Sequence, residues 1–232
     1  MKKYRDWQKR IIFKDAIYFV TADTYDFYPY FKERIFCDLF VENLRLCKFL
    51  KGFLLYGWVL NYDHFHLLIQ PNDEWDISKS MFSIKKQFSH NCNVIMGYNE
   101  FRCRGIRKSD VSLSAPSDTP SSTPSESGQS IVHFRGVGLD YVQHMTLYQK
   151  INRMDVLVCI LKTRFQLKYP NGHTFLKFIW HESFHDHFIR NDWDLDDKLE
   201  YIAYNPEKHE LPEYWQYVFI NPKYDNLTDE TV

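Results

Sequence analysis

Two histidines separated by one bulky residue are the first feature of this sequence that could do chemistry. His64 and His66 flank Phe65 in the stretch NYDHFHLLIQP, residues 61–71. If the stretch is a strand, the two imidazoles share one face, roughly 7 Å apart along it, and Phe65 points into the core. Imidazoles placed in this way can converge on one divalent metal ion. Two surface histidines on a half-exposed strand are the alternative interpretation.

A second candidate pair lies near the end of the chain, in the stretch KLEYIAYNP. Tyr201 and Asn205 are four residues apart, so they share a face if the stretch is helical. A tyrosine hydroxyl beside an amide oxygen that can reach a metal is a nucleophile next to a group that helps to activate its target. An ordinary amphipathic helix with a capping asparagine before Pro206 is the alternative.

A third candidate is the stretch HESFH, residues 181–185, which matches the pattern H-E-x-x-H. On a helix, this pattern binds zinc through its histidines and uses its glutamate as the general base of a metalloprotease. His187 adds another imidazole nearby. The segment is rich in aromatic residues and favours a strand, in which His181 and Glu182 would face apart. A zinc metalloprotease therefore remains only an alternative function.

These candidates must be positioned by alternating strands and helices. The order is strand, helix, strand, strand, helix, insertion, strand and helix, which is the split βαβ order with one extra helix. It predicts an α+β fold: a ferredoxin-like or RRM-like sandwich with a four-stranded antiparallel sheet, helices on one face and a tyrosine-bearing helix. The predicted strands are 16–22, 53–61, 64–70 and 184–190. Four helices are predicted. The first covers 31–50 and stops at Gly52, the second is capped by Asp76, the third lies near 154–165, and the fourth runs from Asp192 or Asp194 to Pro206.

The middle of the chain changes sharply in composition. Residues 109–130 contain nine Ser, two Thr and three Pro and no aromatic residue. Such a segment cannot bury enough apolar surface to offset its ordering entropy, so we expect it to be disordered. The sequence thus predicts a domain in two parts, 1–96 and 175–232, separated by an insertion over 97–174.

Composition gives a weaker indication of the partner. The net charge is -1, so the chain is not basic enough to indicate nucleic acid by itself. The first 14 residues nevertheless carry six Lys or Arg and one Asp, and the last 26 carry two Lys and six acids. A basic front, which includes Lys9 and Arg10, could steer a polyanion to one face. A solubilising arm and a solvated tail are the alternative.

Cysteine content and hydropathy bear on the compartment. The five cysteines are odd in number and include no C-x-x-C pair, which is typical of reduced thiols in the cytoplasm. No signal peptide or transmembrane run is recognisable. We therefore expect a cytoplasmic protein that does not engage a membrane.

Taken in order, four motifs resemble the single-tyrosine HUH transposases, and in particular the branch of REP-associated tyrosine transposases. The likeness covers about residues 10–95 and 175–212. The motifs are HFH at 64–66, IKKQF at 84–88, FHDHFIR at 184–190 and YIAYNP at 201–206.

The resemblance implies metal-dependent cleavage and rejoining of single-stranded or hairpin-forming DNA. It assigns His64 and His66 as ligands of Mg²⁺ or Mn²⁺, with Asn205 as a third ligand. It assigns Tyr201 as the nucleophile, which would form a 5′-phosphotyrosine and free a 3′-hydroxyl. The intermediate keeps the energy of the phosphodiester bond, so no nucleotide cofactor is expected.

DNA contacts are expected from basic side chains in both parts of the domain. The candidates are Lys85, Lys86 and Arg190, together with Lys9 and Arg10 at the N-terminus. A non-catalytic protein that binds hairpin DNA or RNA through the same residues is a further alternative. Either a monomer or a homodimer is compatible with the sequence.

Overall fold

The computed structural model describes residues 12–13, 15–100, 146–171 and 175–225. No helix among them is long and apolar enough to span a bilayer. Two short 3-10 turns, Tyr25–Phe27 and Tyr30–Lys32, join the first strand to the first helix. The longer elements are, in chain order, β1 (Tyr18–Asp23), α1 (Arg34–Lys51), β2 (Leu54–Leu60), β3 (His64–Gln70), α2 (Ile77–Ile95), α4 (Leu147–Lys168), β4 (His185–Phe188), α5 (Asp192–Lys208), β5 (Val218–Ile220) and α6 (Pro222–Asp225).

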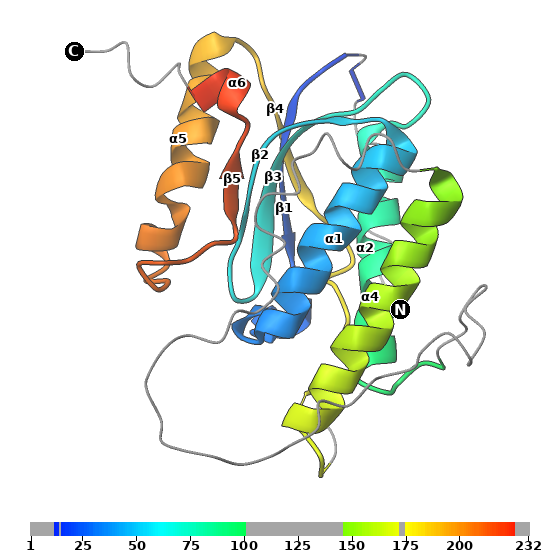
Figure 1. Cartoon of the computed structure of the whole chain (residues 1–232). Helices are drawn as coiled ribbons and strands as arrows, with labels where there is room; N and C mark the ends of the chain where they lie inside the picture. The colour runs from blue at the N-terminus through cyan, green and yellow to red at the C-terminus, as the bar shows by residue number, and fades with distance from the viewer. Residues whose placement is uncertain (1–11, 14, 101–145, 172–174, 226–232) are drawn as a thin grey trace, which may run out of the picture.

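The strands form one antiparallel sheet in the order β4-β1-β3-β2-β5 (Figure 1). β3 lies between β1 and β2, which α1 connects, so the arrangement is the predicted split βαβ. The predicted α+β sandwich is confirmed, with one difference. The sheet has five strands and not four, because β5 pairs with the outer edge of β2 through Trp58 and Phe219. A strand of three residues is too short to give a periodic signal.

Local hydrogen bonds at Glu33 and Gly52 set the two ends of helix α1. The Glu33 carboxylate accepts a hydrogen bond from the Ile35 N–H, and the chain before it forms a 3-10 turn. The helix therefore begins three residues later than the sequence predicts. Gly52 ends it in the left-handed conformation (φ 65°), with its N–H bonded to the Lys48 carbonyl at 2.8 Å. The predicted glycine stop is confirmed.

The hairpin between β2 and β3 fixes which way each side chain of β3 points. The Asn61 N–H donates to the His64 carbonyl at 2.8 Å, which closes the predicted tight turn. Phe65 and the alternate residues Leu67 and Ile69 are buried against the layer of α1 and α2. The Phe65 ring lies 4.8 Å from that of Phe40, measured between centroids. Both histidines of β3 therefore face the other side of the sheet.

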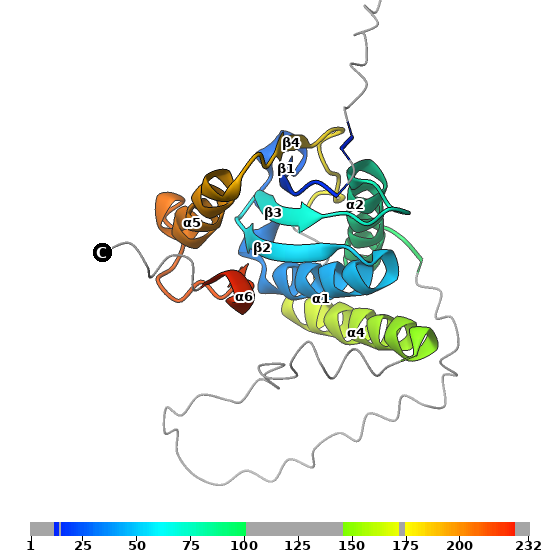
Figure 2. The same cartoon turned by 90° about the horizontal axis from the view of Figure 1, so that it is seen from above.

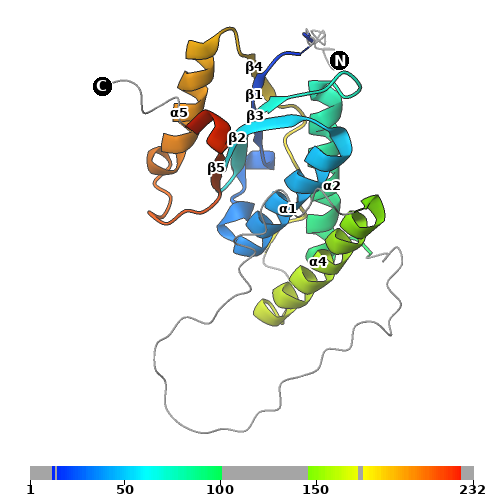
Figure 3. The ribbon, with the colours of Figure 1, turned by 45° about the horizontal axis from the view of Figure 1, so that its top comes forward.

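Helix α4 packs outside α1 and α2 (Figures 2 and 3). It confirms the helix expected near 154–165, and it begins at a capping box formed by Thr146 and Gln149. The buried residues that face the other helices are Met154, Val158, Leu161 and Phe165. The helix lies within the segment 97–174 that we interpret as an insertion. The Ser/Thr/Pro-rich stretch 109–130 lies outside the described residues.

The end of α4 is fastened to the start of α1 by one buried carboxylate. The Lys168 ammonium lies 2.8 Å from Glu33 Oε2, and the Tyr169 hydroxyl donates a short hydrogen bond to the same oxygen. Burial alone would raise the pKa of Glu33, but these bonds and the Ile35 N–H outweigh it, so the pKa lies below its ordinary value.

Helix α5 covers the opposite face of the sheet from α1 and α2 (Figure 2). The contact is close because β2 has a glycine there: a Cβ on Gly57 would lie 3.2 Å from Ile202 Cδ1 and 3.2 Å from the Phe219 carbonyl oxygen. A separate small core fills this side of the sheet. Its buried members are Tyr56, Val59, Leu68, Ile189, Leu195, Leu199 and Ile202.

Both ends of α5 differ from the prediction. The N-terminal cap is Asn191, whose side chain accepts from the Asp194 N–H at 2.9 Å, and neither Asp192 nor Asp194 acts as the cap. Pro206 does not end the helix, which continues to Lys208. Proline removes its own N–H and crowds the carbonyl four residues earlier, but the turn after it still forms, since the Asn205 carbonyl accepts from the His209 N–H at 3.1 Å.

Candidate functional site

The face of the sheet beneath α5 collects the predicted chemical residues. β3 contributes His64 and His66, whose ring centroids are 4.9 Å apart. α5 contributes Tyr201, whose ring meets the His66 ring edge to face at 5.2 Å. Asn205 lies one turn further along the same helix and is fully buried. The structure thus brings all four residues to one side of the sheet.

His66 is held from one side and left open on the other. Its Nδ1 lies 2.8 Å from the Thr21 hydroxyl on β1, and its ring stacks on Phe19 at 5.2 Å. Its Nε2 is buried and has no hydrogen-bond partner among the described residues. Burial first, and then the charges of His64, His209 and Lys208, lower the pKa of His66 to about 3. The ring is therefore neutral near pH 7 and can present a lone pair.

His64 has partners at both ring nitrogens. Its Nδ1 lies 2.6 Å from the Asp63 carboxylate, and its Nε2 lies 2.8 Å from the Asn61 amide nitrogen. The hydrogen bond from His64 is the largest of the influences that lower the pKa of Asp63. A carboxylate on Nδ1 fixes the orientation of the ring and directs Nε2 towards α5.

Asn61 connects His64 to the predicted ligand on α5. Its amide nitrogen also donates to Asn205 Oδ1 at 2.6 Å. The second polar atoms of these two amides, Asn61 Oδ1 and Asn205 Nδ2, are buried without partners among the described residues. Unpaired buried polar atoms are costly, and their concentration beside an open histidine nitrogen is typical of a functional site.

Tyr201 is half-buried between aromatic rings and a cation. Besides His66, its ring contacts Phe19 at 5.6 Å. The Lys208 ammonium donates to its hydroxyl oxygen at 3.3 Å and lies 4.7 Å from the centroid of its ring. The hydroxyl thus lies beside a positive charge at the edge of the histidine pair.

Asn61, Lys208 and His209, like Thr21 and Asp63, were missed as site residues in the sequence. The His209 ring lies 4.9 Å from that of His64, and burial, followed by His64 and Lys208, lowers the pKa of His209. Lys208 follows Tyr201 by seven residues, which is two helical turns. Helical periodicity continued past Pro206 would have indicated it, whereas a helix ended at Pro206 excludes it.

The donor set bears on whether a metal ion fits. Among the described residues, no group of three or more His, Cys, Asp or Glu side chains is placed to hold a metal ion. The predicted set consists instead of His64, His66 and the amide of Asn205. It fits a divalent ion in two respects: His66 Nε2 is unpartnered, and each histidine has its other nitrogen held, by Asp63 or Thr21, as metal-binding histidines usually do.

The predicted DNA contacts lie elsewhere, and their role stays a prediction. Lys85 donates from its ammonium to the carbonyls of His181 and Ser183, at 2.8 and 3.0 Å, and so fastens the segment before β4. Lys86 is exposed on α2, and Arg190 is exposed just before α5. Lys9 and Arg10 lie outside the described residues.

The stretch 181–185 does not form the helix that a zinc protease motif needs. Residues 181–184 are irregular, and β4 begins at His185. The His181 N–H bonds to the Asp23 carbonyl at 2.9 Å, and His187 Nε2 lies 2.9 Å from both Asp194 oxygens. The His181 backbone thus joins the edge of the sheet, and the His187 side chain supports the start of α5. The described structure therefore lacks the helix on which the zinc metalloprotease alternative depends.

Comparison with known proteins supports the fold. No family model matches the sequence, and no curated protein sequence matches it. A solved structure of a REP-associated tyrosine transposase bound to a REP hairpin superposes with a TM-score of 0.50 and 17% sequence identity, over 94% of this chain and 82% of the other. The two proteins share a fold. At this identity, the likeness extends to the architecture and not to any residue's role.

Proposed function

We propose that this protein is a metal-dependent endonuclease and strand transferase for single-stranded DNA, a transposase that works through a 5′-phosphotyrosine on hairpin-forming DNA. The observation that carries the proposal is the edge-to-face contact between Tyr201 and His66, whose Nε2 is the open nitrogen of the pair. This contact places the proposed nucleophile beside a proposed metal ligand, although the two residues lie far apart in the sequence. The shared fold, with a relative bound to a DNA hairpin, supports the choice of substrate.

The reaction exchanges one phosphodiester for another. The Tyr201 oxygen forms a bond to phosphorus, the bond from phosphorus to the 3′-oxygen breaks, and the phenolic proton ends on the released 3′-hydroxyl. A different 3′-hydroxyl attacking the phosphotyrosine reverses these changes and joins a new strand. Lys208 donates to the Tyr201 oxygen and stabilises the negative charge that develops there.

His64, His66 and Asn205 would hold Mg²⁺ or Mn²⁺. A divalent ion bound there supplies charge stabilisation for the phosphate oxygens. Asp63 and Thr21 hold the two imidazoles by their Nδ1 atoms, so the residues of this chain set the ring orientations in advance. Asn61, which contacts both His64 and Asn205, must yield its contacts if their atoms are to reach an ion.

A covalent adduct tests the proposal. The protein is incubated with a labelled single-stranded DNA hairpin and Mn²⁺, denatured, and separated by gel electrophoresis. We expect an adduct from the wild type and none from Tyr201→Phe, which removes one oxygen and keeps the ring. Tyr204→Phe is the matched control, since Tyr204 lies on the same helix but is 61% exposed.

Two results would contradict the assignment. DNA binding without any adduct from the wild type would favour the non-catalytic hairpin-binding alternative. An adduct that persists in Tyr201→Phe and disappears in Tyr204→Phe would transfer the nucleophile to the neighbouring tyrosine.

A further inference from the structure

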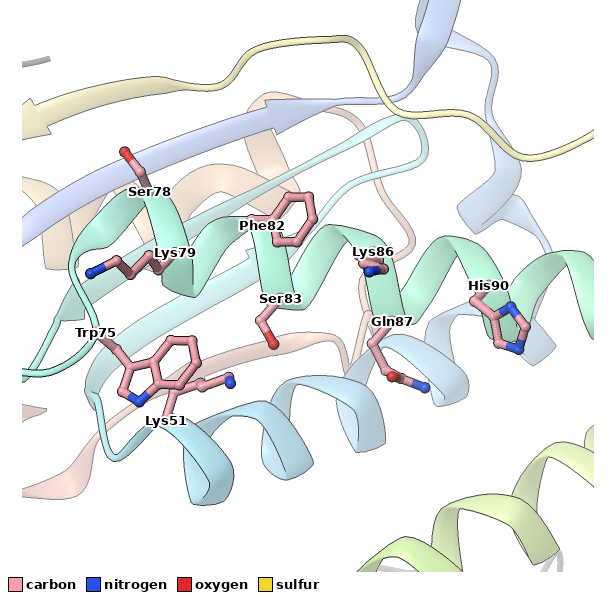
Figure 4. Close-up of a pocket in the computed structure, with 9 residues that line it drawn as sticks. All are labelled: Lys51, Trp75, Ser78, Lys79, Phe82, Ser83, Lys86, Gln87 and His90. Atoms are coloured by element: carbon pink, nitrogen blue, oxygen red, sulfur yellow. The ribbon is translucent and has the colours of Figure 1, made fainter. Parts of the chain in front are cut away.

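A basic and aromatic groove runs along the outer side of α2, between this helix and the end of α1 (Figure 4). It has a volume of about 730 Å³. Trp75 and Lys51 lie at one end and His90 at the other. The residues that matter for its chemistry are Lys51, Trp75, Lys79, Phe82, Lys86 and His90.

The groove is positive although the chain is not. Three lysines and a histidine line it, and none of its described lining residues is acidic, whereas the whole chain has a net charge of -1. Lys79 pairs with Asp76 at 3.3 Å, outside the groove. The hollow around Arg190 differs, because Asp15 and Asp192 also line it.

Aromatic rings alternate with these cations. Phe82 is 64% exposed, although a phenylalanine on a helix normally turns to the core. The Lys86 ammonium lies 5.3 Å from the centroid of the Phe82 ring, and the Lys51 ammonium lies 3.2 Å from that of Trp75. Trp75 lies just before α2, and Phe82 lies on the helix. Each ring has a cation beside it, and the exposed Phe82 ring is the one on which a base can stack.

We propose that this groove binds single-stranded nucleic acid, with bases stacked on the exposed ring and phosphates paired with the lysines. Exposed aromatic faces interleaved with cations are what unpaired nucleotides require. An acidic polypeptide would use the cations but gain little from an exposed Phe82. The inference goes beyond the proposed function, because the groove lies on the helical layer, opposite the face that carries Tyr201 (Figure 2).

The groove therefore contacts nucleotides other than those being cleaved. A strand held there adds affinity that does not depend on the sequence of bases, because every base has a stacking face. Chemistry at Tyr201 and binding in the groove can be measured apart. Binding is measured with a chelator present, and cleavage is measured at saturating DNA.

The experiment uses fluorescence anisotropy with a labelled oligothymidylate, the full-length protein and excess EDTA. The variants are Phe82→Ala, Lys86→Gln and the double variant. The matched controls are Tyr214→Ala, an aromatic residue that is 88% exposed, and the exposed Lys177→Gln. Thermal melts verify that each variant is folded, which we expect because the altered side chains lie on the surface.

We expect the double variant to bind roughly tenfold or more weakly, since stacking of a single base contributes substantially. Lys86→Gln should also reduce the slope of log affinity against log salt by about 0.7. The controls should bind like the wild type.

Either of two results would overturn the inference. The double variant could bind oligothymidylate as tightly as the control variants do. Alternatively, polyglutamate could bind as tightly as the oligonucleotide and show the same dependence on Phe82 and Lys86, which would make the groove a site for acidic polypeptides. If the wild type forms no Tyr201 adduct, the proposed function is contradicted, but the binding measured at the groove still tests this inference.

Discussion

Lys208 reaches back two turns along α5 and donates a hydrogen bond to the hydroxyl oxygen of Tyr201 at 3.3 Å. The contact exists because the helix continues past Pro206. A helix that stopped at the proline would leave the tyrosine without this cation.

Replacing the cation tests its part in the reaction. We expect Lys208→Met to slow formation of the DNA adduct by roughly 10- to 100-fold, which corresponds to one charged hydrogen bond. Lys208→Arg, which retains a positive donor, should recover much of the rate. The rate is measured at saturating hairpin, so that weaker DNA binding does not contribute. Equal rates for Lys208→Met and the wild type would remove Lys208 from the reaction.

A second prediction concerns metal binding without catalysis. A ligand that binds only the folded state stabilises it by RT ln(1 + [L]/Kd), so the melting temperature rises with the ligand concentration. Millimolar Mn²⁺ should therefore raise the melting temperature of the wild type, and the rise should disappear in His64→Ala. His185→Gln, an exposed histidine on β4, is the matched control and should respond like the wild type. A similar rise in all three proteins would mean that the ion binds elsewhere.

The carboxylate that joins α1 to α4 predicts a dependence of stability on pH. The folded state lowers the pKa of Glu33, so its contribution is complete above the unfolded value, near 4.5, and is lost as the pH falls through the folded value. Glu33→Gln should therefore lower the free energy of unfolding by about 1–3 kcal/mol at pH 7, and by progressively less below about pH 4. Chemical denaturation at several pH values measures both proteins. A difference that grows towards acid pH would reverse the sign and contradict the assignment.

A fourth prediction concerns the close approach of α5 to β2. Gly57→Val should destabilise the protein by about 1–3 kcal/mol, because its side chain would meet Ile202 and the Phe219 carbonyl. Gly57→Ala should destabilise the protein less. Adding Ile202→Val to Gly57→Val removes the Cδ1 atom in the contact and should restore part of the lost free energy of unfolding. Free energies of unfolding for the two single variants and the double variant give the coupling. Strict additivity would show that Ile202 does not limit the approach.

The sequence predicted the sheet well where a pattern extends over several residues. Strand 64–70 has the expected limits, because alternation marks it, and the helix after Asp76 begins where expected, because a capping residue marks its start. β5 is too short for either signal. The end of α5 was misplaced for a different reason: proline forbids only one helical hydrogen bond, and whether the next turn forms depends on tertiary contacts.

The site could be predicted only where its residues lie in one element. His64 and His66 are spaced at the period of a strand, and Tyr201 and Asn205 are spaced at the period of a helix, so each pair could be recognised in the sequence. Asn61 could not, because its contacts with His64 and Asn205 depend on how a turn meets a distant helix. Nothing in the local sequence distinguishes this asparagine from the many that occupy turns.

The sheet has a large hydrophobic cluster on one face and a cluster of seven buried residues on the other, beneath α5. Because α5 rests on so few buried apolar residues, we expect it to open as a subglobal unit with a smaller free energy than the rest of the fold. Its backbone amides should exchange with deuterium sooner than those of β3 and α1. If they do, the tyrosine leaves the histidine pair and returns while the rest of the molecule stays folded, and the assembly of the site is itself an equilibrium.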